Sequence, residues 1–222
     1  MNSQGCPPSN VRILVVDDHF VVREGLKSIL LDRYRSVQFG DASNEQEALE
    51  KVWNEEWDVV LLDINLPGRN GLEVMRELKR AKPKLPVIIL SVYPEDQFAI
   101  RALKLGAASY IRKDSAGSEL VQGVEAVLNG GKYITPSVAE KLATHLEHDG
   151  HGAPHEALSD REYQVMCLLG SGKTVKEIGN RLSLSVKTIS TYRTRILEKM
   201  SMRHNADLMR YVMANGLIER EG

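Results

Sequence analysis

Two groups of aspartates follow short apolar segments, and their positions suggest chemistry on a metal ion and a phosphoryl group. Asp17 and Asp18 come directly after residues 13–16 (ILVV), and Asp63 comes after residues 59–62 (VVLL). Runs of this kind are typical of strands buried on both faces of a parallel sheet. Neighbouring strands would bring the three carboxylates together at the carboxyl edge, where doubly wound folds bind ligands. Carboxylate oxygens suit Mg²⁺, and one carboxylate could then attack phosphorus.

Each group of aspartates also has a plain structural explanation. Asp17 and Asp18 could cap a following helix, and Asp63 could begin a turn. Two further residues favour the chemical interpretation, because Ser91 and Lys113 end the next two predicted strands at the same edge. A hydroxyl and an ammonium group there could bind two oxygens of a phosphoryl group carried by Asp63, while Mg²⁺ binds the third.

The composition is that of an ordinary globular protein. The chain has 222 residues, of which 42% are hydrophobic and 27% charged, and its net charge is −1. The segment from Ser159 onward has 11 basic and 7 acidic residues, whereas the rest has 18 basic and 23 acidic residues. This uneven charge agrees with cation binding in the first part and polyanion binding in the second. The apolar runs are too short to span a membrane, and the N-terminus lacks the features of a signal peptide. Two cysteines, Cys6 and Cys167, indicate no disulfide framework, so we expect a cytoplasmic protein.

Strand and helix patterns alternate through about residue 128. Strands are predicted over 12–16, 36–41, 58–62, 87–90 and 109–112, and helices over 19–33, around 48–52, and over 71–81, 96–105 and 118–128. This alternation predicts an α/β fold in which helices cover both faces of a five-stranded parallel sheet. Right-handed crossovers favour a flavodoxin-like strand order.

The chain changes character after this segment. Residues 129–157 are predicted to be a linker, with possible helix over 137–146 and glycines and a proline at Gly150, Gly152 and Pro154. From Ser159 the pattern is helical. A capping box is predicted at Ser159 and Glu162. Helices follow over 165–169, 175–182, 186–200 and 206–215, and together they predict an all-α helix-turn-helix domain.

The helix predicted over 186–200 has two different faces. On a helical wheel one face is apolar: Val186, Ile189, Ile196, Leu197 and Met200. The opposite face carries polar and basic groups that can contact bases or phosphates: Lys187, Thr188, Thr191, Thr194, Arg195 and Glu198. Arg193 falls within the apolar sector, where it could reach a phosphate or a neighbouring subunit.

Residues 11–128 resemble the receiver domain of two-component response regulators. The resemblance rests on a set of residues at matching positions: Asp17, Asp18, Asp63, Pro67, Gly68, Ser91, Gly106, Ala107, Tyr110 and Lys113. It implies that Asp63 accepts a phosphoryl group. Mg²⁺ would be bound by Asp18, Asp63 and the backbone carbonyl of Asn65, with Asp17 acting through water. Lys113 would contact the phosphoryl group, and Ser91 and Tyr110 would form a switch pair in which Tyr110 swings inward.

Residues 158–218 resemble the LuxR-type helix-turn-helix of the NarL/FixJ family. Residues 175–178 fit its scaffold helix and residues 187–192 the start of its recognition helix. The resemblance implies DNA contacts from one face of that helix: Lys187, Thr188, Ser190, Thr191, Arg195 and Lys199. The final helix, with Leu208, Met209, Val212 and Met213, would form partly core and partly dimer contact.

Together the two resemblances predict a phosphorylation-dependent transcription regulator. We expect a leader at 1–10, a receiver at 11–128, a linker at 129–157 and a DNA-binding domain at 158–219. The implied partners are a sensor histidine kinase, double-stranded promoter DNA, RNA polymerase and a second copy of the chain, with no membrane. Two alternatives remain: an enzyme that uses the same carboxylates on a small molecule, and a constitutive DNA-binding protein with a silent receiver.

Four of the six histidines fall within the predicted linker: His145, His148, His151 and His155. A metal-sensing linker is conceivable, since histidine binds Zn²⁺, Cu²⁺ and Ni²⁺. Gly150, Gly152 and Pro154 prevent one helix from presenting all four side chains. We therefore expect no tight zinc site in the linker.

Overall fold

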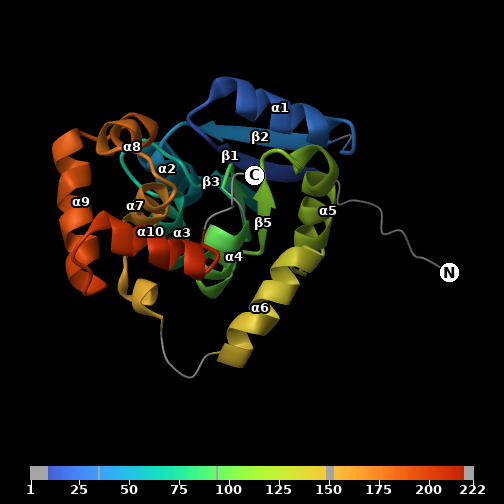
Figure 1. Ribbon diagram of the computed structural model, residues 1–222. Helices are drawn as coiled ribbons and strands as arrows, with labels where there is room; N and C mark the ends of the chain where they lie inside the picture. The colour runs from blue at the N-terminus through green and yellow to red at the C-terminus, as the bar shows by residue number, and fades with distance from the viewer. Residues whose placement is uncertain (1–9, 35, 94, 149–152, 218–222) are drawn as a thin grey trace. The chain divides into compact units, whose positions relative to one another are not determined.

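The structure is a computed structural model that describes residues 10–34, 36–93, 95–148 and 153–217. Its elements follow the order α/β first and all-α second (Figure 1). The strands are β1 (Val11–Val16), β2 (Val37–Ala42), β3 (Val59–Asp63), β4 (Val87–Ser91) and β5 (Ser109–Arg112). The first helices are α1 (Phe20–Leu31), α2 (Glu45–Asn54), α3 (Gly71–Ala81), α4 (Glu95–Lys104) and α5 (Ala116–Leu128). The later helices are α6 (Pro136–His148), the 3₁₀ helix η1 (Pro154–Ala157), α7 (Asp160–Gly170), α8 (Val175–Leu182), α9 (Val186–Lys199) and α10 (Asn205–Ala214).

The five strands form one parallel sheet in the order β2-β1-β3-β4-β5. This is the flavodoxin-like order, and it confirms the predicted fold class. The order reverses beside β1, which pairs with both β2 and β3. The loops after β1 and β3 therefore meet at the switch point of the sheet.

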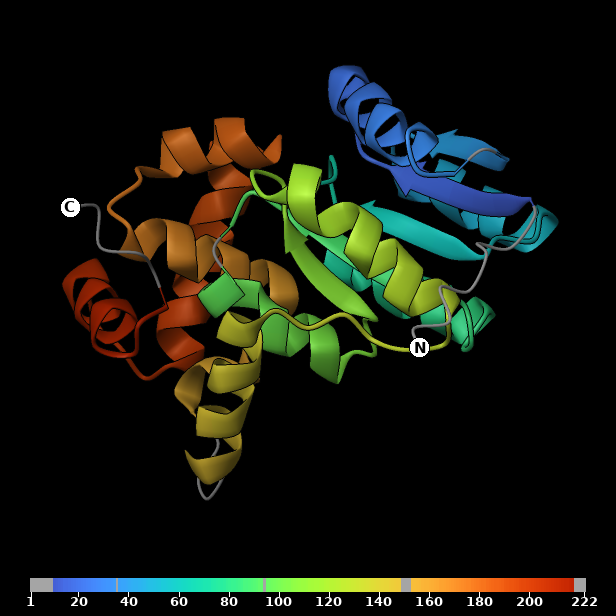
Figure 2. The same ribbon diagram turned by 90° about the vertical axis from the view of Figure 1, so that its right-hand side faces the viewer.

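Apolar side chains on both sides of the sheet explain why these segments form buried strands. One side packs under α1 and α5, with Ile13, Leu61, Ile88, Leu30 and Leu120 in a single buried cluster. The alternate strand residues, among them Leu14, Val60 and Leu62, are also fully buried, and α2 packs beside α3. The ribbon in Figure 2 shows helices layered against the sheet. Burial on both faces accounts for the unbroken apolar runs in the sequence.

Contacts divide the chain into two compact units. The first comprises residues 1–66, 71–92 and 101–134, and the second comprises residues 67–70, 93–100 and 135–222. In the first unit, the chain beyond α5 returns along β5, where Tyr133 N donates to the Ala108 carbonyl at 3.1 Å. The domain limits predicted from the sequence remain predictions.

The second unit contains the predicted helix-turn-helix. The predicted capping box begins α7, since Ser159 accepts from Glu162 N while Glu162 accepts from Ser159 N. A second capping box, which the sequence analysis missed, joins Thr174 and Glu177 at the start of α8. Cys167 is buried in α7, whereas Cys6 lies outside the described residues. Helix α6 is longer than the segment 137–146 and covers part of the predicted linker. No described helix is both long and apolar enough to cross a bilayer.

Candidate metal centre and nucleic-acid interface

The strand register brings the predicted chemical residues to one edge of the sheet. Val16 pairs with Leu62, and Asp63 pairs with Leu90. Asp17, Asp63 and Ser91 therefore stand at the carboxyl ends of three adjacent strands. Lys113 follows β5, and its backbone N–H donates to the Ser91 carbonyl at 2.8 Å. The sheet thus assembles groups that lie far apart in the sequence.

Lys113 joins the two buried carboxylates. Its Nζ lies 2.5 Å from Asp17 Oδ2 and 2.8 Å from Asp63 Oδ2. The side chain of Lys113 is 14% exposed, while those of Asp17 and Asp63 are 0% and 1% exposed. Water screens such a buried cluster weakly, so the ammonium strongly influences both carboxylates.

Burial and the neighbouring charges act in opposite directions on these groups. Burial raises the pKa of the Asp63 carboxyl; Lys113 lowers it and Asp17 raises it further, and the net shift is upward. For Lys113, burial alone would lower the pKa, but contacts with Asp63 and Asp17 outweigh burial and raise it. The contacts with Asp17 and Asp63 therefore favour the charged form of Lys113, whereas burial disfavours the charged form of the Asp63 carboxyl.

The residues at this edge have the donors that a hard divalent cation requires. Asp17, Asp18 and His19 each offer one ligand atom, and these atoms lie within 4.8 Å of one another. Asp63 Oδ1 is buried and is not the oxygen that Lys113 Nζ contacts. A cation bound between Asp18 and Asp63 would satisfy that oxygen, so the donor set fits Mg²⁺. Asn65 follows β3 at this edge and is partly exposed.

Two contacts that the sequence analysis missed fix the loop carrying Asp17 and Asp18. The backbone N–H of His19 donates to Asp17 Oδ1 at 2.8 Å. The Arg23 guanidinium donates to the Asp17 carbonyl at 2.7 Å and to Asp41 Oδ1 at 3.2 Å. No motif signals Arg23, because its role depends on where α1 and β2 meet the loop.

Gly71 is a further residue whose importance only the structure reveals. Its N–H donates to the Ile64 carbonyl at 2.8 Å. A Cβ atom at this position would lie 2.1 Å from the Asp63 carbonyl oxygen and 2.8 Å from Ile64 Cα. Glycine therefore allows the first turn of α3 to approach the backbone of Asp63 closely.

The two predicted switch residues lie inside the fold. Ser91 is 0% exposed at the end of β4, and Tyr110 is 2% exposed on β5. The resemblance to receiver domains implies that Tyr110 swings inward upon activation, whereas Tyr110 is already buried here. Register places Tyr110 opposite Ile89, two residues before Ser91.

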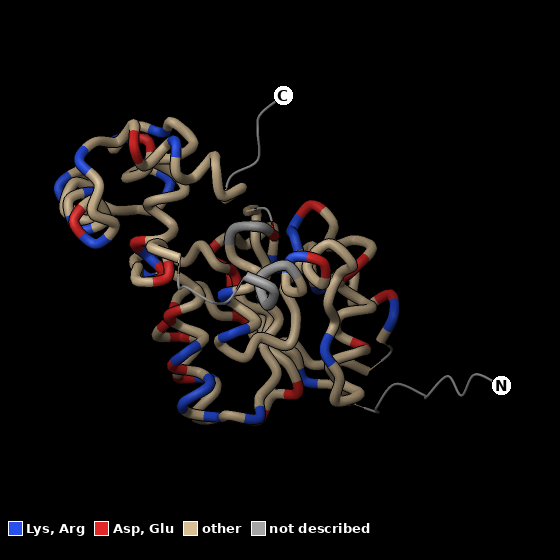
Figure 3. The backbone as a smooth tube through the Cα atoms, turned by 60° about the horizontal axis from the view of Figure 1, so that its bottom comes forward, with Lys and Arg blue, Asp and Glu red and all other residues tan. Residues whose placement is uncertain are grey.

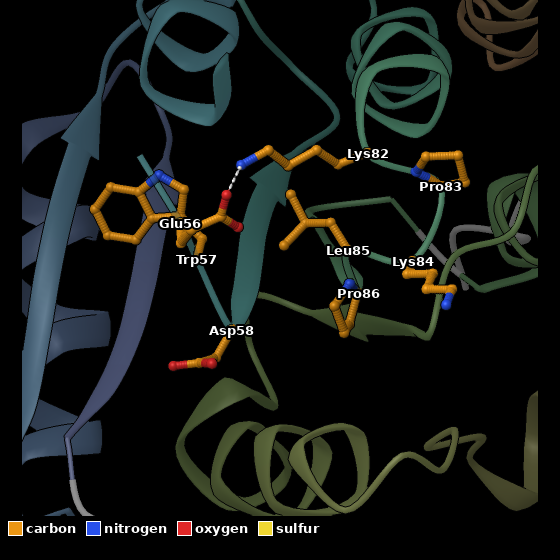
Figure 4. A pocket seen from close by; sticks show the side chains of 8 residues that line it. All are labelled: Glu56, Trp57, Asp58, Lys82, Pro83, Lys84, Leu85 and Pro86. Carbon is orange, nitrogen blue, oxygen red and sulfur yellow. Dashed lines mark hydrogen bonds and ion pairs between the residues drawn. The ribbon is translucent and has the colours of Figure 1, made fainter. Parts of the chain in front are cut away.

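A pocket of about 550 Å³ lies at the other edge of the sheet (Figure 4). Its lining residues precede β3 and β4: Glu56, Trp57, Asp58, Lys82, Pro83, Lys84, Leu85 and Pro86. Lys82 Nζ is already bonded to Glu56 Oε1 at 2.8 Å and to the Glu55 carbonyl at 2.9 Å. Since ligands of doubly wound folds bind at the carboxyl edge, this pocket adds nothing to the candidate metal centre.

In the second unit, α8 and α9 are joined by a tight turn. Ser183 takes a left-handed conformation with φ 54° and ψ 42°. Leu184 N donates to the Gly179 carbonyl at 2.9 Å, and a Cβ on Gly179 would lie 2.8 Å from the Leu184 carbonyl oxygen. Ser185 then caps α9 by accepting from Thr188 N at 3.0 Å. Basic positions recur along the C-terminal helices in Figure 3.

The predicted DNA-contacting side chains differ in their surroundings. Lys187, Ser190, Thr191 and Arg195 are exposed, and Lys187 and Arg195 have no ion pair with any other described residue. The Thr188 hydroxyl lies 2.8 Å from Ser185 Oγ, within the cap. Lys199 Nζ contacts Glu162 Oε2 at 2.6 Å. Within the described residues, Lys187 and Arg195 are therefore the cations of α9 most available to a polyanion.

The apolar face of α9 is largely as predicted, with one exception. Ile189, Ile196 and Met200 are buried, but Val186 is 53% exposed because it lies in the first turn. Arg193 Nε donates to Asn205 Oδ1 at 2.6 Å, at the start of α10. Arg193 thus has a partner within its own chain, which neither predicted role included.

The described part of the linker gives one histidine a structural role. His155 Nδ1 lies 2.7 Å from the Tyr211 hydroxyl of α10. His151 and the side chains of His145 and His148 lie outside what the structure describes. In α10, Leu208 and Val212 are buried while Met213 is 55% exposed. This agrees with the expectation that part of the helix contributes to the core.

Two protein families match the chain in succession. The response regulator receiver domain matches residues 13–125, and the bacterial regulatory proteins of the luxR family match residues 156–212. The chain belongs to the two-component response regulators. It is a DNA-binding regulator of transcription with a LuxR-type helix-turn-helix, and the predicted family is confirmed.

Relatives match the regulator over almost its whole length. Response regulator GacA of Pseudomonas viridiflava is 37% identical over 210 residues, which cover 94% of this chain and 98% of GacA. Response regulator UvrY of Escherichia coli K12 is 33% identical and covers 95% of this chain and 97% of its own. Among solved structures, RcsB of Salmonella enterica serovar Typhimurium, bound to promoter rprA with the phosphomimetic BeF3⁻, has a TM-score of 0.61. At 23% identity over 92% of this chain and 100% of that one, it shows the fold alone.

Proposed function

We propose that Asp63 accepts a phosphoryl group from a sensor histidine kinase and that this modification controls dimerisation and promoter binding. The observation that carries the proposal is the contact of one ammonium group, Lys113 Nζ, with both Asp17 and Asp63. A cation at this position can stabilise the negative charge of the carboxylate and also that of the phosphoryl oxygens during transfer. The GacA and UvrY relatives bear the name response regulator, which supports the same role here.

The chain's own groups would divide the work of transfer. An Asp63 oxygen attacks phosphorus, the bond from phosphorus to the donor's leaving atom breaks, and the leaving group departs with the electron pair. Lys113 and Ser91 bind oxygens of the transferred group. Asp18, Asp63 and the Asn65 carbonyl would hold Mg²⁺, and Asp17 would act through water. When bound, Mg²⁺ neutralises negative charge on the phosphoryl oxygens.

The response to phosphorylation would begin at Ser91 and Tyr110. A phosphoryl group adds about −1.5 to −2 charges at the edge of the sheet. Ser91, which is buried at the end of β4, would donate its hydroxyl to this group. Because Tyr110 is already inside the fold, we propose that activation holds the ring in this position. A modification that makes one of two conformations more populated in this way can change a distant surface of the domain.

DNA would be read by the exposed face of α9. Six residues are proposed to contact bases or phosphates: Lys187, Thr188, Ser190, Thr191, Arg195 and Lys199. Two recognition helices of a homodimer would occupy half-sites about 10–10.5 bp apart, centre to centre. RNA polymerase is a proposed further partner at the promoter. We propose no turnover of a small-molecule substrate, since the Asp63 site serves a regulatory phosphoryl group.

Replacement of the acceptor tests the proposal directly. Asp63→Asn should abolish incorporation of phosphate from acetyl phosphate, because an amide is a poor nucleophile toward phosphorus. Labelling of the wild-type regulator should also vanish with EDTA, since the bound metal is required. Intact-mass measurement before and after mild base would count one labile phosphoryl group. Undiminished labelling of Asp63→Asn would place the acceptor elsewhere and refute the proposal, while continuous release of phosphate would favour an enzyme.

A further inference from the structure

The chain leaves β5 through a tight turn that carries Lys113. Ser115 N donates to the Arg112 carbonyl at 3.2 Å and closes the turn, and Ser115 Oγ donates to the same carbonyl at 3.2 Å. Lys113 is the second residue of this turn, and its N–H donates to the Ser91 carbonyl of β4 at 2.8 Å. The backbone that carries the ammonium group is therefore tied both to the neighbouring strand and to the residues just before α5.

The side chains on either side of Lys113 bind each other. Arg112 Nε donates to Asp114 Oδ1 at 3.0 Å, and Arg112 Nη2 donates to Asp114 Oδ2 at 2.6 Å. A pair of parallel bonds fixes the orientation of the two groups as well as their separation. The Arg112 guanidinium also lowers the pKa of the Asp114 carboxyl, which favours the charged carboxylate. The pair thus joins the first and third residues of the turn across the residue that carries the ammonium.

This ion pair is placed where it can affect geometry more than stability. The side chains of Arg112 and Asp114 are 34% and 62% exposed, and exposed pairs stabilise a fold little because water screens them. The Lys113 ammonium between them is 14% exposed and contacts two buried carboxylates. Because a lysine side chain is a flexible four-carbon stem, the position of its ammonium depends on where the turn places the backbone.

We propose that Arg112 and Asp114 are positioning residues for phosphoryl transfer, which hold the turn in the conformation that delivers the Lys113 ammonium to the carboxylates. The inference rests on the proposed function of Asp63 and adds two residues that act on the reaction only through Lys113. A catalytic group displaced by about 1 Å can slow a reaction by about 10²-fold. An exposed pair can therefore matter for the rate where it hardly matters for stability.

The rate of labelling by saturating acetyl phosphate, measured on the full chain with Mg²⁺, tests the proposal. Asp114→Ala should lower this rate by about tenfold, within the range that a small displacement causes. Asp114→Glu keeps the carboxylate and should recover most of the rate. The matched control is Glu77→Ala, which removes another carboxylate paired with an arginine, Arg80, at 2.8 Å on α3, and it should label like the wild type.

Three results of this experiment would overturn the proposal. The first is a normal rate in Asp114→Ala, and the second is an equal loss in Asp114→Glu. The third is a large loss of stability of Asp114→Ala in urea, since this would make the pair a structural element rather than a positioning one. An unchanged midpoint in urea, together with the slower labelling, supports positioning.

A double-mutant cycle tests whether the two residues act as a pair. Arg112→Ala should also slow labelling, and the double variant should lose no more than Arg112→Ala alone, because the partner of Asp114 is already gone. Residues that share one interaction give such non-additive effects. Losses that multiply in the double variant would show that the residues act separately and would refute the proposal.

Nuclear magnetic resonance of the lysine Nζ nitrogens, detected through the non-exchanging Cε protons, reports on Lys113 itself. Its signal is assigned by its absence from Lys113→Arg. The signal should shift in Asp114→Ala and stay in place in Glu77→Ala; an unchanged signal in Asp114→Ala contradicts action through Lys113. Failure here is distinguishable from failure of the proposed function, since labelling of wild-type protein and its loss in Asp63→Asn measure that function separately.

Discussion

The receiver edge and the recognition helix place their charged side chains in opposite environments. Asp17, Asp63 and Lys113 are buried and contact one another, whereas Lys187 and Arg195 are exposed. In the proposed function the first group acts on a phosphoryl group, and such a site is desolvated and oriented before its ligand arrives. The second group is proposed to contact DNA, and side chains that contact a large polyanion gain from remaining accessible. One chain thus contains a site assembled by distant segments and a surface presented by a single helix.

This difference has consequences for mutation. A change near the receiver edge disturbs several elements, because each carboxylate depends on neighbours from other strands. A change on the exposed face of α9 alters one contact and leaves the fold intact. Four substitutions, taken from the largest expected effect to the smallest, test this contrast.

Gly71→Ala should have the largest effect. The added methyl group would lie 2.1 Å from the Asp63 carbonyl oxygen, so α3 or β3 must shift. Overpacking of this kind costs about 1–3 kcal/mol or more, and phosphorylation should fall by at least about tenfold, the loss expected from about 1.4 kcal/mol at the transition state. Urea denaturation and labelling by acetyl phosphate measure the two effects.

Gly25→Ala is the matched control for that substitution. Gly25 lies within α1, and nothing lies within 4 Å of an added Cβ. Alanine is favoured over glycine inside a helix by about 0.5–1 kcal/mol, so this variant should be slightly more stable than wild type. If both variants label normally, the close approach of α3 to Asp63 is unimportant.

Lys187→Ala should weaken DNA binding and leave phosphorylation unchanged. If Lys187 contacts a base, the substitution should reduce the binding free energy by about 1–3 kcal/mol, and selectivity should be lost at the one base pair that Lys187 contacts. If it contacts a phosphate, the loss should be uniform over sequences, with a shallower dependence on salt. Fluorescence anisotropy with promoter fragments at several salt concentrations separates the two. Unchanged affinity on all DNA would show that this face is not the reader.

Glu162→Gln tests a contact that links the start of α7 to the end of α9. Glu162 accepts from Ser159 N and Lys199 Nζ, at 2.8 and 2.6 Å. Its burial raises the carboxyl pKa, but Lys199 and Ser159 outweigh burial, so the pKa is lowered from 4.5. The folded state therefore favours the charged carboxylate. Its stabilisation should be present above pH 4.5 and be lost as the pH falls through the lowered value.

The substitution should cost about 1 kcal/mol at pH 7, a modest value because solvent screens the exposed partner, Lys199. The difference from wild type should shrink below pH 4.5. Chemical denaturation across this pH range measures both. The control Glu198→Gln changes an exposed residue of α9 and should show neither effect. A loss of stability in Glu162→Gln that stays constant with pH would contradict a role for the charge of Glu162.

Ser183→Gly should give the smallest effect, a gain in stability. Ser183 has φ 54°, a conformation that costs a side chain about 1–2 kcal/mol. Glycine removes this strain but increases the freedom of the unfolded chain, which leaves a gain of about 0.5 kcal/mol. Ser171 has φ −81°, so Ser171→Gly should destabilise. Thermal denaturation of the two variants should show shifts of opposite sign.

The sequence by itself determined the features that depend on local pattern. Unbroken apolar runs predicted the strands because parallel strands are buried on both faces. The spacing of Ser159 and Glu162 predicted a capping box, which α7 contains, because its bonds join residues only three positions apart. The receiver and helix-turn-helix families were also evident from short motifs, and the matches confirm them. The individual site residues stay predictions.

Only the tertiary structure decided the contacts between distant segments. Lys113 reaches Asp17 across 96 positions of sequence, Arg23 holds the Asp17 loop, and Gly71 gives the Asp63 backbone its space. Arg193, which the helical wheel placed among apolar residues, contacts Asn205 of α10. Local propensity contains no information about such partners, because their positions follow from how strands pair and helices pack. Sequence therefore identified the chemical groups, while packing determined which groups meet.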